Sequence, residues 1–243
     1  MKLVVTEKNI AAQKIADLLG VGKPKADKVY STPVYRFERD GEEWVTIGLR
    51  GHILEPNFVP ALTYKKRGGW IGVDANGEMI PADLPTDLPK PPFKKKKPFV
   101  PDGVELNAWK MDALPYLIYA PIEKLPKEKD IIRSLKNLAK KADSIVIATD
   151  FDREGELIGS DALTCIREVN EEAPVSRARY SAITKEEITR AFTNLVELDV
   201  DLAQAGASRQ DIDLIWGAVL TRYLTLVKFA GYGNVRSSGR VQT

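Results

Sequence analysis

The chain has 243 residues, a formal net charge of +2 and one cysteine. This length allows one large or two modest domains, and the near-neutral charge neither favours nor excludes a nucleic-acid partner, so any basic footprint must be local. The lone Cys165 excludes an internal disulfide and a cysteine-cluster zinc site within this chain. With no signal-peptide pattern and no apolar run near the roughly 20 residues of a membrane helix, we expect a soluble cytoplasmic protein.

The chain begins with a predicted strand and helix. Residues 2–6 (KLVVT) are typical of a buried strand, and apolar residues from Ile10 onward predict an amphipathic helix that ends near Gly20. Glu7 and Lys8 lie at the junction between the two. This charged pair is either part of a ligand site at a sheet edge or a helix start whose acidic residue the macrodipole favours.

Residues 28–38 and 42–49 are predicted to be two strands, joined by the hairpin signal Asp40-Gly41. The second strand leads into His52, the only histidine. A lone histidine is more often a structural residue, but a position directly behind a strand and beside a glycine keeps a role in a site open.

The periodic pattern is lost between about residues 64 and 126. Prolines between residues 81 and 98 predict an extended connection with polyproline character. The run Lys94–Lys97 within it is either a solvated loop or a contact with a phosphate backbone.

Five of the seven residues 150–156 are charged, and they follow directly on a predicted apolar strand. Residues 127–142 predict a helix, and residues 144–149 (SIVIAT) predict a buried parallel strand. Asp150, Asp152 and Glu154 come next, at the strand end where ligands bind in open α/β sheets. In an extended backbone their side chains would point the same way, and three hard oxygen ligands suit Mg²⁺. The alternative is a turn and a helix cap without a metal.

Helices are predicted to dominate the last third of the chain. Thr184 with Glu187 has the spacing of a capping box, and residues 208–217 are expected to have one polar and one packed face. By composition residues 231–243 are a loop, although their guanidinium and backbone N–H groups suit phosphates. The predicted elements are a helix at 156–169, an edge strand at 175–180, and helices at 185–195, 199–206 and about 208–229.

Several motifs together resemble the type IA DNA topoisomerases, and the archaeal topoisomerase I branch in particular. They stand in the family's order and cover nearly the whole chain except residues 64–126. The motifs are TEKN (6–9), GHILE (51–55), ATDFDREGELIG (148–159), YSAIT (180–184), SRQDIDLIWG (208–217) and SSGRVQT (237–243).

The resemblance implies an α/β fold, with a Rossmann-like TOPRIM domain over residues 1–175 that carries the Lys/Pro-rich insertion at about 64–126. A helical domain for single-stranded DNA would follow over 176–243, incomplete. The resemblance also implies that Lys8 lies beside the scissile phosphate and that Arg153 contacts DNA or holds the carboxylates. The implied Mg²⁺ ligands are Glu7, Asp150, Asp152 and Glu154, and the implied DNA-binding residues are His52, Arg209, Asp213, Ser238, Gly239, Arg240, Val241 and Gln242.

The implied activity is ATP-independent relaxation of negatively supercoiled DNA by transient cleavage and religation of one strand. The family places its nucleophilic tyrosine downstream of the GRVQT motif, so we expect it beyond residue 243 and expect the fragment alone not to cleave DNA. A nucleoid-associated monomer is expected. The alternatives are another TOPRIM enzyme of phosphoryl transfer, primase- or nuclease-like, and a non-catalytic fragment that binds single-stranded DNA.

Overall fold

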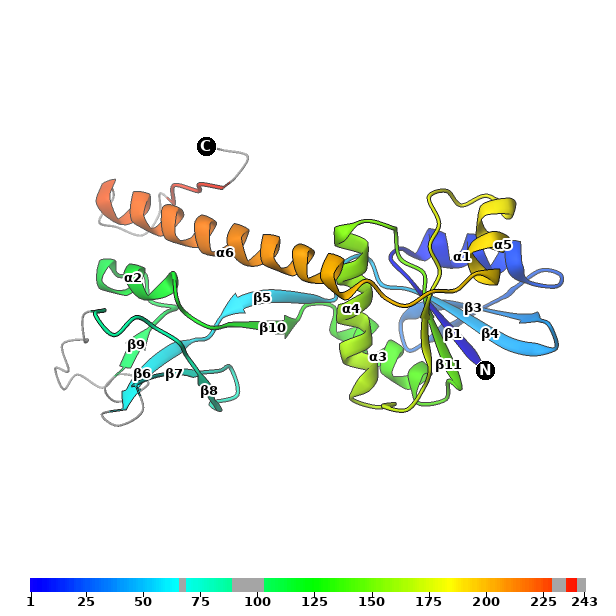
Figure 1. The fold of residues 1–243 in the computed structure, drawn as a ribbon, viewed down its shortest axis with the longest axis horizontal. Helices are drawn as coiled ribbons and strands as arrows, with labels where there is room; N and C mark the ends of the chain where they lie inside the picture. The colour runs from blue at the N-terminus through cyan, green and yellow to red at the C-terminus, as the bar shows by residue number, and fades with distance from the viewer. Residues whose placement is uncertain (66–68, 89–102, 229–234, 240–243) are drawn as a thin grey trace. The chain divides into compact units, whose positions relative to one another are not determined.

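The computed structural model describes residues 1–65, 69–88, 103–228 and 235–239, and these form two compact units (Figure 1). Unit 1 comprises Met1–Glu55 with Pro126–Ser208, and unit 2 comprises Pro56–Leu125 with Arg209–Thr243. Each unit is built from two separate stretches of the chain, so the unit boundaries differ from the predicted domain boundary at residue 175. The reason is packing: apolar residues from the last third of the chain complete the core of unit 2.

Unit 1 is built on a mixed six-stranded sheet. Strands β1, β4, β11 and β12 are parallel, and β2 and β3 continue the sheet antiparallel beyond β4. The predicted strands 2–6 and 144–149 are therefore confirmed as neighbouring parallel strands, although the second ends at residue 147. In spatial order the strands are β12 (Val175–Arg177), β11 (Ser144–Ile147), β1 (Lys2–Thr6), β4 (Glu42–Gly48), β3 (Thr32–Arg39) and β2 (Lys25–Val29).

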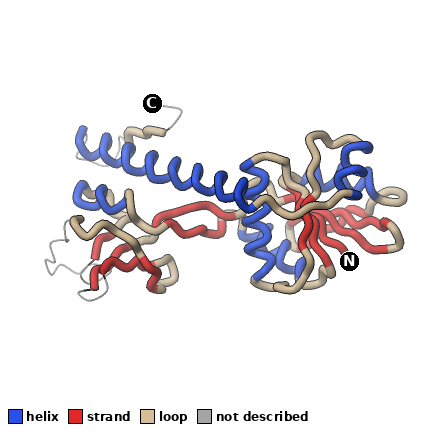
Figure 2. The backbone as a smooth tube through the Cα atoms, in the orientation of Figure 1, coloured by secondary structure: helices blue, strands red, loops and turns tan. Residues whose placement is uncertain are grey.

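One predicted strand is in fact two. Residues 28–38 were expected to be continuous, but Tyr30 has a left-handed φ of 52° and turns the chain between β2 and β3. The hairpin at Asp40-Gly41 is confirmed, because β3 and β4 pair across it. Figure 2 shows the resulting antiparallel strands at one side of the sheet.

Helices cover both faces of this sheet, as period-two side-chain alternation requires. In β1, Leu3 and Val5 join a core with α3 and α4, whereas Val4 joins a second core with α1 and α5 (Figure 1). Ile10 was predicted to lie on the apolar face of α1, but it is 68% exposed. The predicted α/β class is confirmed. The helices are α1 (Asn9–Leu19), α3 (Lys129–Ala139), α4 (Arg153–Arg167) and α5 (Lys185–Thr193).

The capping box before α5 is half confirmed. The Thr184 side chain accepts a hydrogen bond from the Glu187 N–H at 3.3 Å, as predicted. The Glu187 carboxylate, however, accepts from the backbone and hydroxyl of Ser181 and pairs with Arg190 instead of returning to the backbone of the cap. The cap therefore also ties the preceding turn to the helix.

Unit 2 contains strands where the sequence showed no pattern. The loss of a periodic pattern between about residues 64 and 126 does not mean a lack of strands, because apolar residues there form a sheet around Leu62 and Trp70. Of the extended connection predicted over residues 81–98, residues 82–88 form no helix or strand and residues 89–98 lie outside the described residues. Lys94–Lys97 lie outside the described residues. The elements are β5 (Leu54–Phe58) paired with β10 (Ile122–Pro126), the sheet of β8 (Met79–Pro81), β7 (Gly69–Val73), β6 (Ala61–Lys65) and β9 (Gly103–Glu105), the 3-10 turn Met111–Ala113 and α2 (Leu114–Leu117).

A single helix, α6 (Val200–Lys228), replaces the two helices predicted over 199–229. Leu214, Ile215, Ala218 and Val219 pack against the core of unit 2. The opposite face is not uniformly polar as expected, because Ile212 and Trp216 are 62% and 54% exposed. None of the described helices, α6 included, combines the length and apolar character needed to cross a membrane.

Candidate metal and nucleic-acid site

The loops after β1, β4 and β11 meet at the carboxyl edge of the sheet in unit 1. They meet because the three strands are parallel neighbours, and this edge is where open α/β sheets bind ligands. The backbone confirms the contact: the Gly51 N–H donates to the Glu7 carbonyl at 2.9 Å, and the Ala148 N–H donates to the Val5 carbonyl at 2.7 Å. Motifs from three distant parts of the sequence are therefore joined at one place.

Lys8 supplies a cation shared by two of the predicted acids. Its Nζ lies 2.8 Å from Glu7 Oε1 and 3.6 Å from Asp150 Oδ2. The hydrogen bond to Glu7 and its negative charge raise the pKa of Lys8, and the charge of Asp150 adds to this shift. The ammonium is thus held protonated at the acidic edge.

The other two acids are engaged differently. Asp152 is the N-cap of α4, and its Oδ1 accepts a hydrogen bond from the Gly155 N–H at 2.7 Å. Glu154 lies in the first turn of α4, and its Oε1 is 3.4 Å from His52 Nε2. The expectation that an extended backbone aligns all three carboxylates is wrong, because the helix begins at Arg153. Asp152 caps α4, which is the role that the sequence analysis gave as the alternative to metal binding.

These contacts decide how the residues fit a divalent cation. Among the residues that the structure describes, no three or more His, Cys, Asp or Glu side chains are grouped as a complete metal site. Glu7 and Asp150 nevertheless approach one cation, the Lys8 ammonium, from two strand ends. Their carboxylate oxygens are the hard ligands that Mg²⁺ prefers, so this pair fits the ion, with Asp152 and Glu154 nearby at the start of α4.

A buried arginine, Arg177, donates hydrogen bonds to the backbone of the loop at residues 148–152, between β11 and α4, which we call the acidic loop. The side chains of Arg177 and Glu156 are both 0% exposed, and Arg177 Nε donates to Glu156 Oε1 at 2.8 Å. Arg177 Nη2 donates to the Asp150 carbonyl at 3.0 Å, and Nη1 donates to the carbonyls of Ala178 and Ile147 at 2.7 and 3.3 Å. The sequence analysis did not predict this pair. The available signal was an arginine within the predicted edge strand at 175–180.

Two further contacts shape the loop. The Tyr180 hydroxyl donates to the Ala148 carbonyl at 2.7 Å, and the Thr149 hydroxyl donates to the Gly155 carbonyl at 2.7 Å. Burial raises the pKa of Tyr180, so the phenol stays a protonated donor. At Gly155 an added Cβ would lie 2.0 Å from the Asp150 carbonyl oxygen, so only glycine permits this close return of the chain.

The outer side of the loop carries an aromatic residue. Phe151 is 48% exposed, and the Arg179 guanidinium lies 4.7 Å from its ring centroid. Arg179 Nη2 is also 3.6 Å from Asp199 Oδ2, directly before α6. Arg153 is exposed at the first position of α4, in keeping with its predicted place at this edge.

The remaining predicted DNA contacts belong to unit 2. Arg209 and Asp213 are exposed one turn apart on α6. Ser238 is 8% exposed, and its N–H donates to Thr221 Oγ1 at 3.0 Å while its carbonyl accepts from the same hydroxyl at 3.1 Å. Gly239 follows it, whereas Arg240, Val241 and Gln242 lie outside the described residues.

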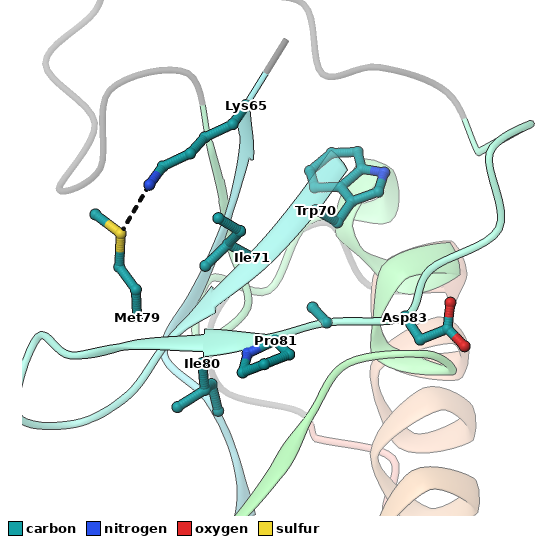
Figure 3. A pocket seen from close by; sticks show the side chains of 8 residues that line it. Lys65, Trp70, Ile71, Met79, Ile80, Pro81 and Asp83 are labelled. Atoms are coloured by element: carbon teal, nitrogen blue, oxygen red, sulfur yellow. Dashed lines mark hydrogen bonds between the residues drawn. The ribbon is translucent and has the colours of Figure 1, made fainter. Parts of the chain in front are cut away.

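Unit 2 also contains an open pocket of about 440 Å³ beside β7 and β8 (Figure 3). Lys65 Nζ lies 3.1 Å from Met79 Sδ at one side, and Asp83 lies at the other. The remaining lining is largely apolar and lacks the paired carboxylates of the sheet edge in unit 1. The lining residues are Lys65, Trp70, Ile71, Met79, Ile80, Pro81, Ala82 and Asp83.

Comparison with known proteins agrees with this geometry. Residues 2–183 match the family model of the Toprim domain, and the chain belongs to that family. It is 36% identical over 245 residues to DNA topoisomerase 1 of Archaeoglobus fulgidus, covering 99% of this chain and 29% of that protein. It is 34% identical over 242 residues to DNA topoisomerase 1 of Thermoplasma acidophilum, covering 100% of this chain and 26% of that protein.

A solved structure shows the same fold. Full-length topoisomerase I from Thermotoga maritima matches with a TM-score of 0.51 at 20% identity, covering 98% of this chain and 28% of that one. The predicted resemblance to topoisomerases of the archaeal type I branch is thereby confirmed. The chain spans less than a third of the length of these relatives.

Proposed function

We propose that this chain supplies the magnesium-binding edge and part of the single-strand groove of an ATP-independent type IA topoisomerase, which relaxes negatively supercoiled DNA at the nucleoid. One observation carries the proposal: the Lys8 ammonium lies between Glu7 and Asp150 where parallel strands end. The similarity along 99% of the chain to a protein named DNA topoisomerase 1 supports DNA as the substrate.

Each residue at the edge has a role in this proposal. Glu7 and Asp150 would hold Mg²⁺, with Asp152 and Glu154 completing the acidic rim. When bound, the ion would neutralise and orient the phosphodiester and the 3′-hydroxyl. The Lys8 side chain is 63% exposed and would donate hydrogen bonds to a non-bridging phosphoryl oxygen as charge develops on it.

Further DNA contacts are proposed for residues of each unit. His52 and Arg153 would contact the backbone near the scissile phosphate. In unit 2, Arg209 and the segment Ser238–Gln242 would contact the strand through guanidinium and backbone N–H groups, and the Asp213 carboxylate would accept hydrogen bonds from donors on the DNA. Two observations support these proposed contacts in unit 2. Arg209 and Asp213 are exposed, and Ser238 is held by hydrogen bonds to Thr221 of α6.

The proposed cleavage step needs a tyrosine from beyond residue 243. In that step the tyrosine oxygen loses its proton and attacks phosphorus to form a 5′-phosphotyrosine, the bond between phosphorus and the 3′-oxygen breaks, and the 3′-oxygen takes up a proton and leaves as the 3′-hydroxyl. Tyr180 is close to the acidic loop but unsuited to attack, because it is 5% exposed and donates its hydroxyl proton to the Ala148 carbonyl. Since the family resemblance places the nucleophile beyond residue 243, we expect residues 1–243 to bind metal and DNA without forming an adduct.

Metal binding is tested with the double variant Asp150→Asn/Asp152→Asn, measured by calorimetric Mg²⁺ titration. We expect binding to be lost and the fold to be kept, because asparagine caps helices as well as aspartate does. The matched control is Asp27→Asn/Glu43→Gln, which neutralises the two acids that flank Arg36 on β2 and β4. Equal Mg²⁺ affinity in both double variants would refute the metal assignment.

Covalent trapping tests the catalytic role. The purified chain is mixed with labelled single-stranded DNA and Mg²⁺ and quenched with denaturant. We expect DNA binding without an adduct. An adduct would place the nucleophile within residues 1–243. Irreversible cutting or primer synthesis would select a nuclease- or primase-like enzyme instead.

A further inference from the structure

The buried arginine of unit 1 contacts the acidic loop at its backbone. Arg177 Nη2 donates to the carbonyl of Asp150 at 3.0 Å, while Nη1 donates to the carbonyls of Ile147 and Ala178. Ile147 is the last residue of β11, and Asp150 is the first acid behind it. One guanidinium therefore joins the end of the strand, the start of the loop and the neighbouring strand β12.

The carbonyl that Arg177 holds belongs to a proposed metal ligand. Fixing the peptide group of Asp150 restricts the direction in which its carboxylate leaves the backbone, and hence its distance from Lys8 and Glu7. The same peptide oxygen faces Gly155 so closely that an added Cβ there would lie 2.0 Å away. The loop is thus clamped between α4 and a buried cation.

The Glu156 carboxylate neutralises the buried guanidinium of Arg177. Its Oε1 accepts from Arg177 Nε at 2.8 Å, and both side chains are 0% exposed. Its Oε2 has no hydrogen-bond partner among the described residues. A buried ion pair is often no more stabilising than apolar residues of similar volume, so stability alone gives little reason to keep this one. What apolar residues cannot supply is a planar fork that joins three carbonyls.

We propose that Arg177, neutralised by Glu156, is a positioning residue that sets Mg²⁺ affinity through the backbone of Asp150. The proposal rests on the proposed metal site. Residues that orient metal ligands typically change affinity 10- to 100-fold when replaced. Arg177→Lys keeps the charge but loses the fork, so we expect it to weaken Mg²⁺ binding by at least about tenfold with the fold intact.

The experiment is calorimetric Mg²⁺ titration of the full 243-residue chain, with circular dichroism and thermal unfolding to confirm folding. A second variant, Arg177→Met/Glu156→Leu, removes both buried charges together and so avoids leaving one unpaired. We expect it to fold and to bind Mg²⁺ at least about tenfold more weakly. The control is Arg36→Lys, which weakens a two-acid contact on β3, away from the acidic edge.

The outcomes separate this inference from the metal site itself. Asp150→Asn is titrated in the same series, and unchanged affinity in that variant would refute the metal site. If Asp150→Asn loses binding while a folded Arg177 variant keeps wild-type affinity, the positioning role is overturned. The role is equally overturned if neither Arg177 variant folds, because the pair then serves stability.

Discussion

The Nζ atom of Lys8 lies 3.6 Å from Oδ2 of Asp150, although the two residues are far apart in the sequence. They meet because β1 and β11 are parallel neighbours in register, with Val5 opposite Ile147. Each residue lies a few positions past the end of its strand. A cation is thereby placed among acids at the sheet edge before any metal binds.

This contact makes Lys8 a competitor for Mg²⁺. We expect Lys8→Met to raise Mg²⁺ affinity by up to about fivefold at low salt, since two charges about 4 Å apart in water interact by about 1 kcal/mol. The effect should shrink as salt is added, because the Lys8 side chain is 63% exposed. Calorimetric titration measures it, and Lys2→Met, which loses a pair with Glu42 instead, is the control. Weaker Mg²⁺ binding in Lys8→Met would contradict the prediction.

Gly155 should tolerate no side chain. An added Cβ would lie 2.0 Å from the Asp150 carbonyl oxygen, which is a backbone atom that cannot rotate away. We expect Gly155→Ala to lower the free energy of unfolding by about 3 kcal/mol, measured by urea denaturation. Gly217→Ala is the control, because its Cβ would meet only the Ser238 carbonyl at 3.8 Å and alanine favours a helix. Similar stability in both variants would show that the loop can relax.

Cys165 should be unreactive in the folded chain. Its side chain is 2% exposed, and burial raises the pKa of the thiol to about 11. A raised pKa means less thiolate at pH 8, whereas an unfolded cysteine with a pKa near 8.5 is partly ionised there. We expect alkylation by iodoacetamide at pH 8 to be at least about 100-fold slower in the native chain than in urea. Comparable rates would indicate that α4 opens readily.

Thr221 should determine how firmly the segment 235–239 lies on α6. Its hydroxyl accepts from the Ser238 N–H at 3.0 Å and donates to the Ser238 carbonyl at 3.1 Å. We expect Thr221→Val to speed amide exchange at Ser238 by about tenfold and to weaken single-strand binding, because a preordered segment binds at lower entropic cost. Thr221→Ser keeps the hydroxyl and should restore both. Unchanged exchange in Thr221→Val would show that other contacts hold the segment.

The pattern of neighbouring residues was enough to predict the central parallel strands of unit 1. Apolar runs at 2–6 and 144–149 predicted buried strands, and charged residues behind them predicted a polar sheet edge, because strand period and turn chemistry are properties of neighbouring residues. Unit 2 was missed because its strands are short and carry Pro and Gly, as in Met79–Pro81 and Gly69–Val73, so their alternation is weak in sequence.

The sequence by itself was enough to predict which polar residues lie at the edge: its motifs indicated the acids, Lys8 and His52. Only the tertiary structure decided how they are held. Asp152 became a helix cap because α4 starts at Arg153, and Arg177 became the support of the acidic loop. The Asp152 cap is a local contact with Gly155, whereas the role of Arg177 depends on contacts between segments distant in sequence. No local period encodes such contacts, because they form only when parallel strands bring separate loops to one edge.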